Sequence, residues 1–126
     1  MNGRSFFVDS NILIYLLSGD QRIAEILQDK NIYCSFITEI ELRSSKKFNL
    51  REEHALEDIL SSIHILDINP KIKTHTIYLR KKYGLKLPDA IIAASSIFID
   101  IPLITADKAF NKIKETDIYL YNLWKF

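Results

Sequence analysis

Four acidic residues stand beside apolar segments of the chain, where hydrophobic packing alone would not select a charge. They are Asp9 in FFVDSNILIY, Glu41 in TEIELR, Asp89 in KLPDAIIAA and Asp107 in LITADKAF. A carboxylate next to a buried segment is costly unless it is paired, hydrogen-bonded or bound to a cation. Four carboxylates that converge in the fold can hold a hard divalent cation such as Mg²⁺ or Mn²⁺. Metal-dependent chemistry on a phosphodiester is therefore the first hypothesis.

Each of the four acids also has a purely structural interpretation. Asp9 could be a strand-end turn residue that caps the next helix, and Asp107 could cap the helix that follows it. Thr38 to Glu41 matches a capping box, in which the glutamate reaches back to the Thr38 amide. Asp89 lies in a predicted first helical turn, where the helix dipole favours acids. All four nevertheless lie at helix starts or strand ends, where α/β folds build functional sites.

The remaining composition argues against several other functions. Three glycines in 126 residues leave no glycine-rich phosphate loop, and the three histidines lack zinc-binding spacing. The single cysteine, Cys34, excludes an intramolecular disulfide and is compatible with the cytoplasm. The longest apolar run, residues 12–17, is too short for a membrane span, and the N-terminus does not resemble a secretion signal. With a formal charge of +1, any affinity for nucleic acid must come from local clusters.

The chain alternates strand-like and helix-like segments. Strands are expected at residues 5–8, 31–35, 63–68, 102–105 and 118–123. Helices are expected at residues 11–17, 20–30, 38–47, 51–61 and 70–83, from residue 88 onward, and at 107–115. This alternation predicts one α/β domain, residues 1–126, with a mostly parallel sheet.

Two local signals and one topological rule refine this prediction. Asn69 and Pro70 mark a helix start, and Gly84 suits the end of the same helix. Ligands of parallel sheets bind beyond the carboxyl ends of the strands. Asp9 and Asp107 each follow a predicted strand, so we expect both on the same rim of the sheet.

The segments VDSNILIY, TEIELR, LPDAIIAA and LITADKAF resemble, in order and spacing, the four acidic motifs of PIN domains. The similarity covers essentially the whole chain and extends to the compact toxins of VapBC-type toxin–antitoxin pairs. It implies a three-layer α/β/α sandwich and an endoribonuclease that depends on Mg²⁺ or Mn²⁺. By motif, the catalytic and metal-binding residues would be Asp9, Glu41, Asp89 and Asp107, supported by Asn11 and Thr105. The chain departs from the family pattern at Asp100, where a glycine often precedes the strand.

Two basic segments flank the acids and could contact RNA phosphates. Their candidate residues are Arg43, Lys46 and Lys47 in the first segment, and Arg80, Lys81, Lys82 and Lys86 in the second. The alternative is a solvated helix face, because Lys and Arg side chains are mostly exposed.

The resemblance also implies partners, namely a cognate antitoxin protein and a second copy of the chain in a homodimer. Two other functions stay open at this point. One is an RNA-processing PIN nuclease without an antitoxin, and the other is a PIN-like module that binds RNA or protein without cleaving. Retention of all four acids argues against the non-cleaving module.

Overall fold

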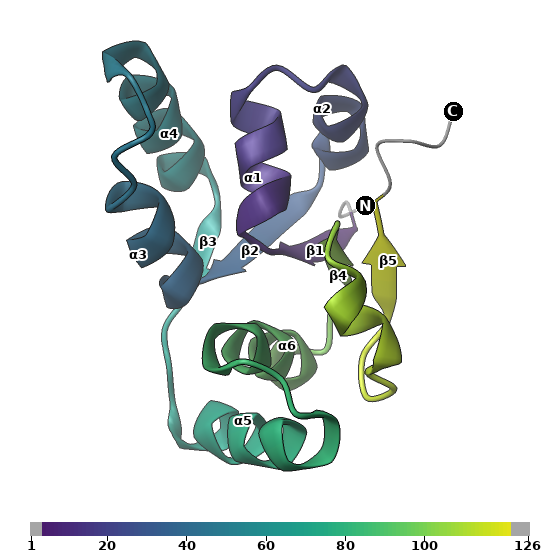
Figure 1. Cartoon of the computed structure of the whole chain (residues 1–126). Helices are drawn as coiled ribbons and strands as arrows, with labels where there is room; N and C mark the ends of the chain where they lie inside the picture. The colour runs from purple at the N-terminus through teal and green to yellow at the C-terminus, as the bar shows by residue number, and fades with distance from the viewer. Residues whose placement is uncertain (1–3, 122–126) are drawn as a thin grey trace.

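The computed structural model describes residues 4–121, which form an α/β fold around a five-stranded sheet (Figure 1). The strands are β1 (Ser5–Val8), β2 (Asn31–Ser35), β3 (His64–Leu66), β4 (Leu103–Thr105) and β5 (Ile118–Leu120). Their order is β3-β2-β1-β4-β5, and every pairing between them is parallel. The predicted α/β class is confirmed.

Helices cover both faces of the sheet. They are α1 (Ser10–Leu17), α2 (Gln21–Leu27), α3 (Phe36–Arg43), α4 (Leu50–Ser62), α5 (Pro70–Tyr83), α6 (Leu87–Ile99) and the short 3₁₀ helix η1 (Lys108–Lys112). Figure 1 shows α1 to α4 on one side of the sheet and α5 and α6 on the other. The three-layer arrangement implied by the family resemblance is therefore confirmed. No helix among residues 4–121 is both long and apolar enough to cross a membrane.

The alternation of side chains along β1 explains the two layers. Phe6 and Val8 pack into the cluster under α1 to α4, where Ile12 is also fully buried. Phe7 points to the opposite face and packs with Leu79 and the apolar side of α6. Because successive strand residues face opposite sides of a sheet, one four-residue strand contributes to both cores.

The helix α5 begins and ends where local signals predict. Asn69 caps it, since its side chain accepts a hydrogen bond from the Ile72 amide at 2.8 Å. Gly84 follows the helix with φ of +66°, a left-handed conformation that glycine adopts without steric cost. α6 is buried from Ala90 to Ser96 and packs against α5.

Three predicted elements differ in the structure. α3 begins at Phe36, because Ser35 is its N-cap and accepts a hydrogen bond from the Ile37 amide at 3.1 Å. The capping box that started at Thr38 is therefore wrong, and Thr38 is buried inside the helix. The helix expected at 107–115 is only the short η1. The last strand ends at residue 120 rather than 123, and residues 122–123 lie outside the described residues.

Candidate active site at the carboxyl edge of the sheet

Asp9 and Thr105 lie at the ends of two neighbouring parallel strands, β1 and β4. The Thr105 hydroxyl donates a hydrogen bond to Asp9 Oδ2 at 2.5 Å. The same hydroxyl accepts a hydrogen bond from the Asp107 amide at 3.0 Å. Both Asp9 and Thr105 are buried, with 4% and 0% of their surfaces exposed. One buried hydroxyl therefore joins two of the four predicted acids, and Asp9 and Asp107 do share one rim of the sheet.

The environment of Asp9 disfavours its charge. The pKa of the Asp9 carboxyl is raised from 3.8 to about 6, mainly by burial and to a smaller extent by the charges of Asp107 and Asp89. The Thr105 hydrogen bond and the Ile12 amide lower this pKa but do not cancel the effect of burial. Asp9 occupies the N-cap position of α1, as the capping interpretation expects, but its side chain makes no full capping hydrogen bond. Its second oxygen, Oδ1, is buried and has no hydrogen-bond partner among residues 4–121.

Asp107 and Asn11 fix the loop that follows β4. Asp107 precedes η1, and its Oδ1 accepts a hydrogen bond from the Ala109 amide at 2.9 Å, so its capping interpretation is correct. A cap occupies one carboxylate oxygen, and the charge of Asp107 still raises the pKa of both Asp9 and Asp89. Asn11 Oδ1 accepts a hydrogen bond from the Ala106 amide at 3.2 Å and ties the start of α1 to this loop.

Glu41 and Asp89 reach the same region from two helices. Asp89 lies in the first turn of α6, as predicted. Partial burial raises the pKa of Asp89 first, followed by the charge of Asp107, while Lys86 lowers it and Glu41 raises it. Glu41 projects from α3, which contacts α6. The charges of Asp89 and Asp107 thus act on Asp9, whereas Glu41 acts on Asp89 alone, so Asp9, Asp89 and Asp107 are neighbours and Glu41 lies on the Asp89 side of them.

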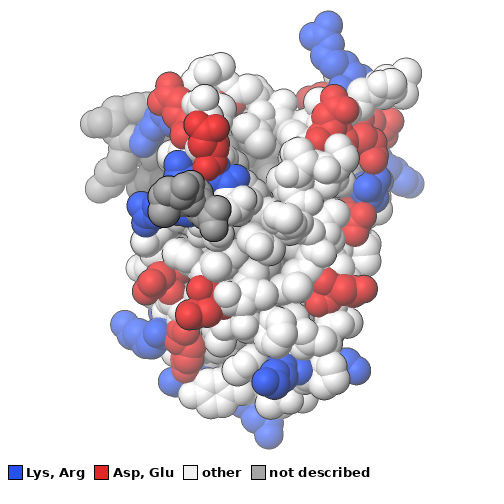
Figure 2. Space-filling view, turned by 180° about the vertical axis from the view of Figure 1, so that it is seen from behind, with Lys and Arg blue, Asp and Glu red and all other residues white. Residues whose placement is uncertain are grey.

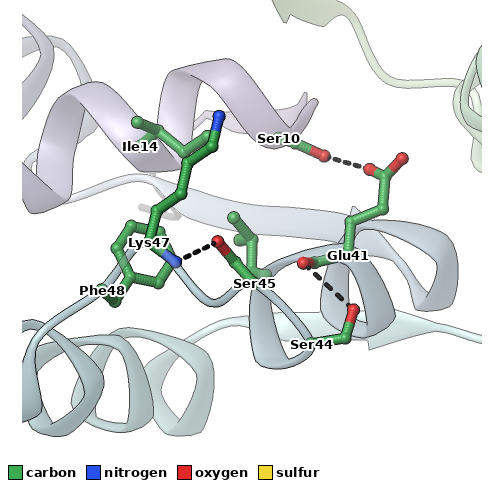
Figure 3. Close-up of a pocket in the computed structure, with 8 residues that line it drawn as sticks. Ser10, Ile14, Glu41, Ser44, Ser45, Lys47 and Phe48 are labelled. Carbon is green, nitrogen blue, oxygen red and sulfur yellow. Dashed lines mark hydrogen bonds between the residues drawn. The ribbon is translucent and has the colours of Figure 1, made fainter.

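A cleft of about 610 Å³ lies beside Glu41, between α1 and α3 (Figure 3). The Glu41 carboxylate points across to Ser10, whose hydroxyl donates a hydrogen bond to Glu41 Oε1 at 2.6 Å. The Lys47 side chain also lines the cleft, together with Phe48 and Ile14. Sequence reasoning missed Ser10, for which the only signal was its place between Asp9 and Asn11 in the first motif.

The predicted basic residues divide into two groups. Lys47 lines the cleft beside Glu41, and Lys86 is close enough to Asp89 to lower its pKa. Arg43 instead forms ion pairs with Glu39, at 3.0 Å, and with Glu57. The structure thus brings two of these cations to the acids and engages Arg43 elsewhere.

The basic residues of α5 do not form one surface. Lys82 forms an ion pair with Glu115 at 2.8 Å, and Arg80 donates a hydrogen bond to the Leu85 carbonyl at 3.3 Å. Arg80, Lys81 and Lys82 are consecutive, so the 100° turn per helical residue points them in different directions. Lys46 and Lys81 are exposed. On the face that Figure 2 presents, the drawn Lys and Arg side chains lie in separate groups interleaved with acids.

The donor set of the cluster consists of carboxylate oxygens, which hard divalent cations prefer. Within residues 4–121, no group of three or more Asp, Glu, His or Cys side chains is placed to hold a metal ion. Mg²⁺ keeps several waters and commonly takes only one or two carboxylates from a protein. The unpartnered Asp9 Oδ1 provides one such oxygen. The residues therefore fit a hydrated divalent cation better than an ion fully enclosed by protein.

Comparison with known proteins agrees with this architecture. The model of the PIN domain family matches residues 6–116, and the chain belongs to this family. Comparison with curated proteins gave no match.

Solved structures of toxin–antitoxin systems are similar to the chain. A chain of VapBC2 from Rickettsia felis, bound to promoter DNA, has a TM-score of 0.78 and 22% identity over 94% of this chain and 99% of that chain. A chain of a toxin–antitoxin complex from Klebsiella pneumoniae has a TM-score of 0.74 and 33% identity over 87% of this chain and 93% of that chain. A chain of VapBC-5 from Mycobacterium tuberculosis has a TM-score of 0.72 and 18% identity over 93% of this chain and 98% of that chain. The resemblance to VapC-type toxins is thus confirmed.

Proposed function

We propose that this protein is a metal-dependent endoribonuclease that hydrolyses RNA phosphodiester bonds and is the toxin of a toxin–antitoxin pair. The observation that carries the proposal is the placement of Asp9 and Asp107 around Thr105 at the carboxyl edge of a PIN-domain sheet, with Asp89 near both. Membership of the PIN family and the 33% identity to a toxin–antitoxin protein support it. RNA and an antitoxin would both be met in the cytoplasm, where we place its action.

Three of the acids, Asp9, Asp89 and Asp107, would hold Mg²⁺ or Mn²⁺, directly or through water. When bound, the cation offsets phosphate charge and lowers the pKa of a bound water. Asp9 is held by Thr105, so one carboxylate oxygen keeps a fixed place while the unpartnered Oδ1 remains for the cation. Glu41 would act as a further ligand or as a general base that accepts a proton from the attacking water.

Substrate binding requires positive charge beside the acids, because bare carboxylates repel a phosphodiester. Lys47 and Lys86 are the best-placed cations, since the first lines the cleft and the second lowers the pKa of Asp89. Lys46, Arg80 and Lys81 would contribute more distant phosphate contacts. Arg43 and Lys82 carry less of this role in our proposal, because each is engaged in ion pairs.

A protein partner would bind next to the acids. Ile40 and Leu87 are exposed apolar residues close in sequence to Glu41 and Asp89, with 57% and 50% of their surfaces accessible. Apolar side chains at the rim of a charged site favour protein contacts. We propose that an antitoxin segment covers this region and that the chain forms a homodimer.

The test is expression of the chain with and without the small reading frame next to its gene, followed by mapping of cleaved RNA ends. We expect growth arrest and new RNA ends for the chain alone, and relief of both on co-expression. In vitro, a chelator should abolish cleavage and Mn²⁺ should restore it. Cleavage that persists in chelator would reject the metal, and cleavage indifferent to the neighbouring protein would favour an RNA-processing nuclease.

Glu39 and Glu41 provide a matched pair of controls for this test. Both lie on α3 in the same motif, but Glu39 is bound to Arg43 whereas Glu41 faces the cleft. We expect Glu41→Gln to lose cleavage and Glu39→Gln to retain it. If neither variant cleaves less RNA than the wild type, the non-cleaving binding module becomes the better account.

A further inference from the structure

Glu41 is an exposed acid, and one contact holds its carboxylate. The residue is exposed on α3, and a glutamate side chain loses appreciable rotamer freedom when it is held in one position. Among the described residues, Ser10 is the one whose side chain hydrogen-bonds the Glu41 carboxylate, at 2.6 Å. The Ser10 hydroxyl also lies 3.5 Å from that of the buried Thr38. The direction of Glu41 therefore depends on the start of α1.

The start of α1 is itself well anchored. Asp9, directly before Ser10, is buried and bound to Thr105. Asn11, directly after it, accepts a hydrogen bond from the Ala106 amide. Ser10 thus stands between two residues that are tied to β4 and its following loop. Because Ser10 is fixed on both sides, its hydroxyl can hold the Glu41 side chain of α3 in one position.

The Ser10 hydroxyl has no competing role in the helix. Ser10 is the first residue of α1, and the position that a capping side chain would take belongs to Asp9. Its donated hydrogen bond goes to a carboxylate 31 residues away rather than to a local backbone group. A hydrogen bond to a charged group is stronger than one between neutral groups. The contact is therefore better suited to orienting Glu41 than to stabilising α1.

We propose that Ser10 is a positioning residue, whose hydroxyl holds the Glu41 carboxylate toward the other three acids for catalysis. This inference rests on the proposed nuclease function and adds a requirement to it. Ser10 contacts neither substrate nor cation in this role and acts only through Glu41. The role requires a hydroxyl at this position, so Thr should replace Ser where Ala cannot.

Ser44 provides a matched control on the same cleft. Both serines line it, but the Ser44 hydroxyl donates to the Ile40 carbonyl at 2.6 Å and lies near the Glu41 carbonyl rather than its carboxylate (Figure 3). We expect Ser10→Ala to lower kcat about tenfold, the effect of losing one hydrogen bond to a charged group. KM for RNA and the melting temperature should change little. Ser44→Ala should leave kcat unchanged, and Ser10→Thr should recover most of it.

A second measurement asks whether Ser10 acts through Glu41. Glu41→Asp shortens the side chain by one methylene, so its carboxylate no longer reaches Ser10. Adding Ser10→Ala to this variant should then cause no further loss, because the two changes remove one interaction. Losses that multiply would overturn the inference, as would a wild-type kcat for Ser10→Ala while Glu41→Gln is inactive. Failure of the proposed function itself has a different signature, which is absence of RNA cleavage by the wild type.

Discussion

Asp9 and Asp107 are held by the ends of two adjacent strands, whereas Glu41 and Asp89 project from two helices that cover opposite faces of the sheet. The first pair is joined through the buried Thr105 hydroxyl. In the second pair, the hydrogen bond that the described residues supply is the one from the Ser10 hydroxyl to Glu41. We call these pairs the strand-held acids and the helix-held acids.

The difference indicates that the two pairs of acids have different roles in the site. Strand ends in the middle of a sheet are fixed by hydrogen bonds on both sides, so the strand-held acids are organised before any ligand binds. Such preorganisation lowers the cost of reorganising charge during a reaction. The helix-held acids lack this support from strand ends, and Glu41 is held by Ser10 instead. The site thus combines two acids at strand ends with two acids on helices.

The largest effect on RNA cleavage is expected when the charge of one strand-held acid or one helix-held acid is removed. Asp9→Asn and Glu41→Gln should both reduce RNA cleavage by orders of magnitude, because each removes a negative charge that a cation or proton requires. Asp9→Asn should keep the fold and melt at an equal or slightly higher temperature, since it removes a buried charge that Asp89 and Asp107 repel. Glu41→Gln should not change the melting temperature, because Glu41 is exposed. Toxicity that persists in Asp9→Asn would contradict a catalytic role for the strand-held acids.

Loss of the Thr105 hydroxyl should lower the free energy of unfolding, because this hydroxyl supports the strand-held acids. Thr105→Val keeps the shape of a fully buried side chain but leaves Asp9 Oδ2 and the Asp107 amide without their partner. We expect a loss of about 1–3 kcal/mol in the free energy of unfolding, together with a clear fall in cleavage. Thr105→Ser should retain most of both. Equal unfolding midpoints for Thr105→Val and wild type in urea would show that the strand-held acids are not rigidly coupled.

The dependence of stability on pH should come from the strand-held side. The pKa of Asp9 is raised to about 6 in the folded protein, so between its ordinary value of 3.8 and about 6 the folded state binds more protons than the unfolded state. The free energy of unfolding must then fall as pH rises through this window, by roughly 3 kcal/mol at most, at 1.36 kcal/mol for each pKa unit.

Thermal melting in chelator from pH 7 down to pH 5 tests this expectation. Wild type should gain stability on acidification, with a smaller contribution of the same sign from Asp89, and Asp9→Asn should be flatter. Glu115, whose pKa is lowered to about 2, loses its stabilising contribution only below the ordinary glutamate range and does not interfere. A wild type that loses stability on acidification to pH 5 would contradict the burial of an uncompensated Asp9 carboxylate.

Much of this arrangement follows from local sequence signals. The strand before Asp9, the helix start at Asn69 and the left-handed turn at Gly84 each depend on neighbouring residues, and all were predictable. The start of α3 was not, because Ser35 and Thr38 are both good caps and burial of Thr38 decided between them. At Asp100 the structure explains why a glycine is common at this position, since φ is +55°, and this chain adopts the same left-handed conformation with an aspartate.

Contacts between distant segments could not be predicted from the sequence. Arg43 and Lys82 looked like candidates for RNA contact, yet their carboxylate partners include Glu57 and Glu115, 14 and 33 residues away. The Ser10–Glu41 contact joins two helices in the same way. Motif spacing predicts which acids belong to the site, and the packing of helices on the sheet determines which other side chains reach them.

The smallest effect is expected at the basic residues. Lys86→Gln should weaken RNA binding a few-fold and lower the slope of log affinity against log salt by about one, because one fewer phosphate contact releases counterions. Lys82→Gln should leave that slope unchanged, since Lys82 is paired with Glu115. Binding of an RNA oligonucleotide to Asp9→Asn, which does not cleave it, can be followed over a salt series. If the slope of log affinity against log salt is the same with and without Lys86→Gln, Lys86 does not contact an RNA phosphate.

The central claim is that the four carboxylates form one site for a divalent cation. The most direct measurement is the melting temperature of wild type and Asp9→Asn during a titration with Mn²⁺, with RNA absent. A cation that binds the folded state alone must stabilise it as its concentration rises. We predict a rising melting temperature for wild type and a much smaller rise for Asp9→Asn. Equal rises in the two proteins, or none in wild type at millimolar Mn²⁺, would contradict the account.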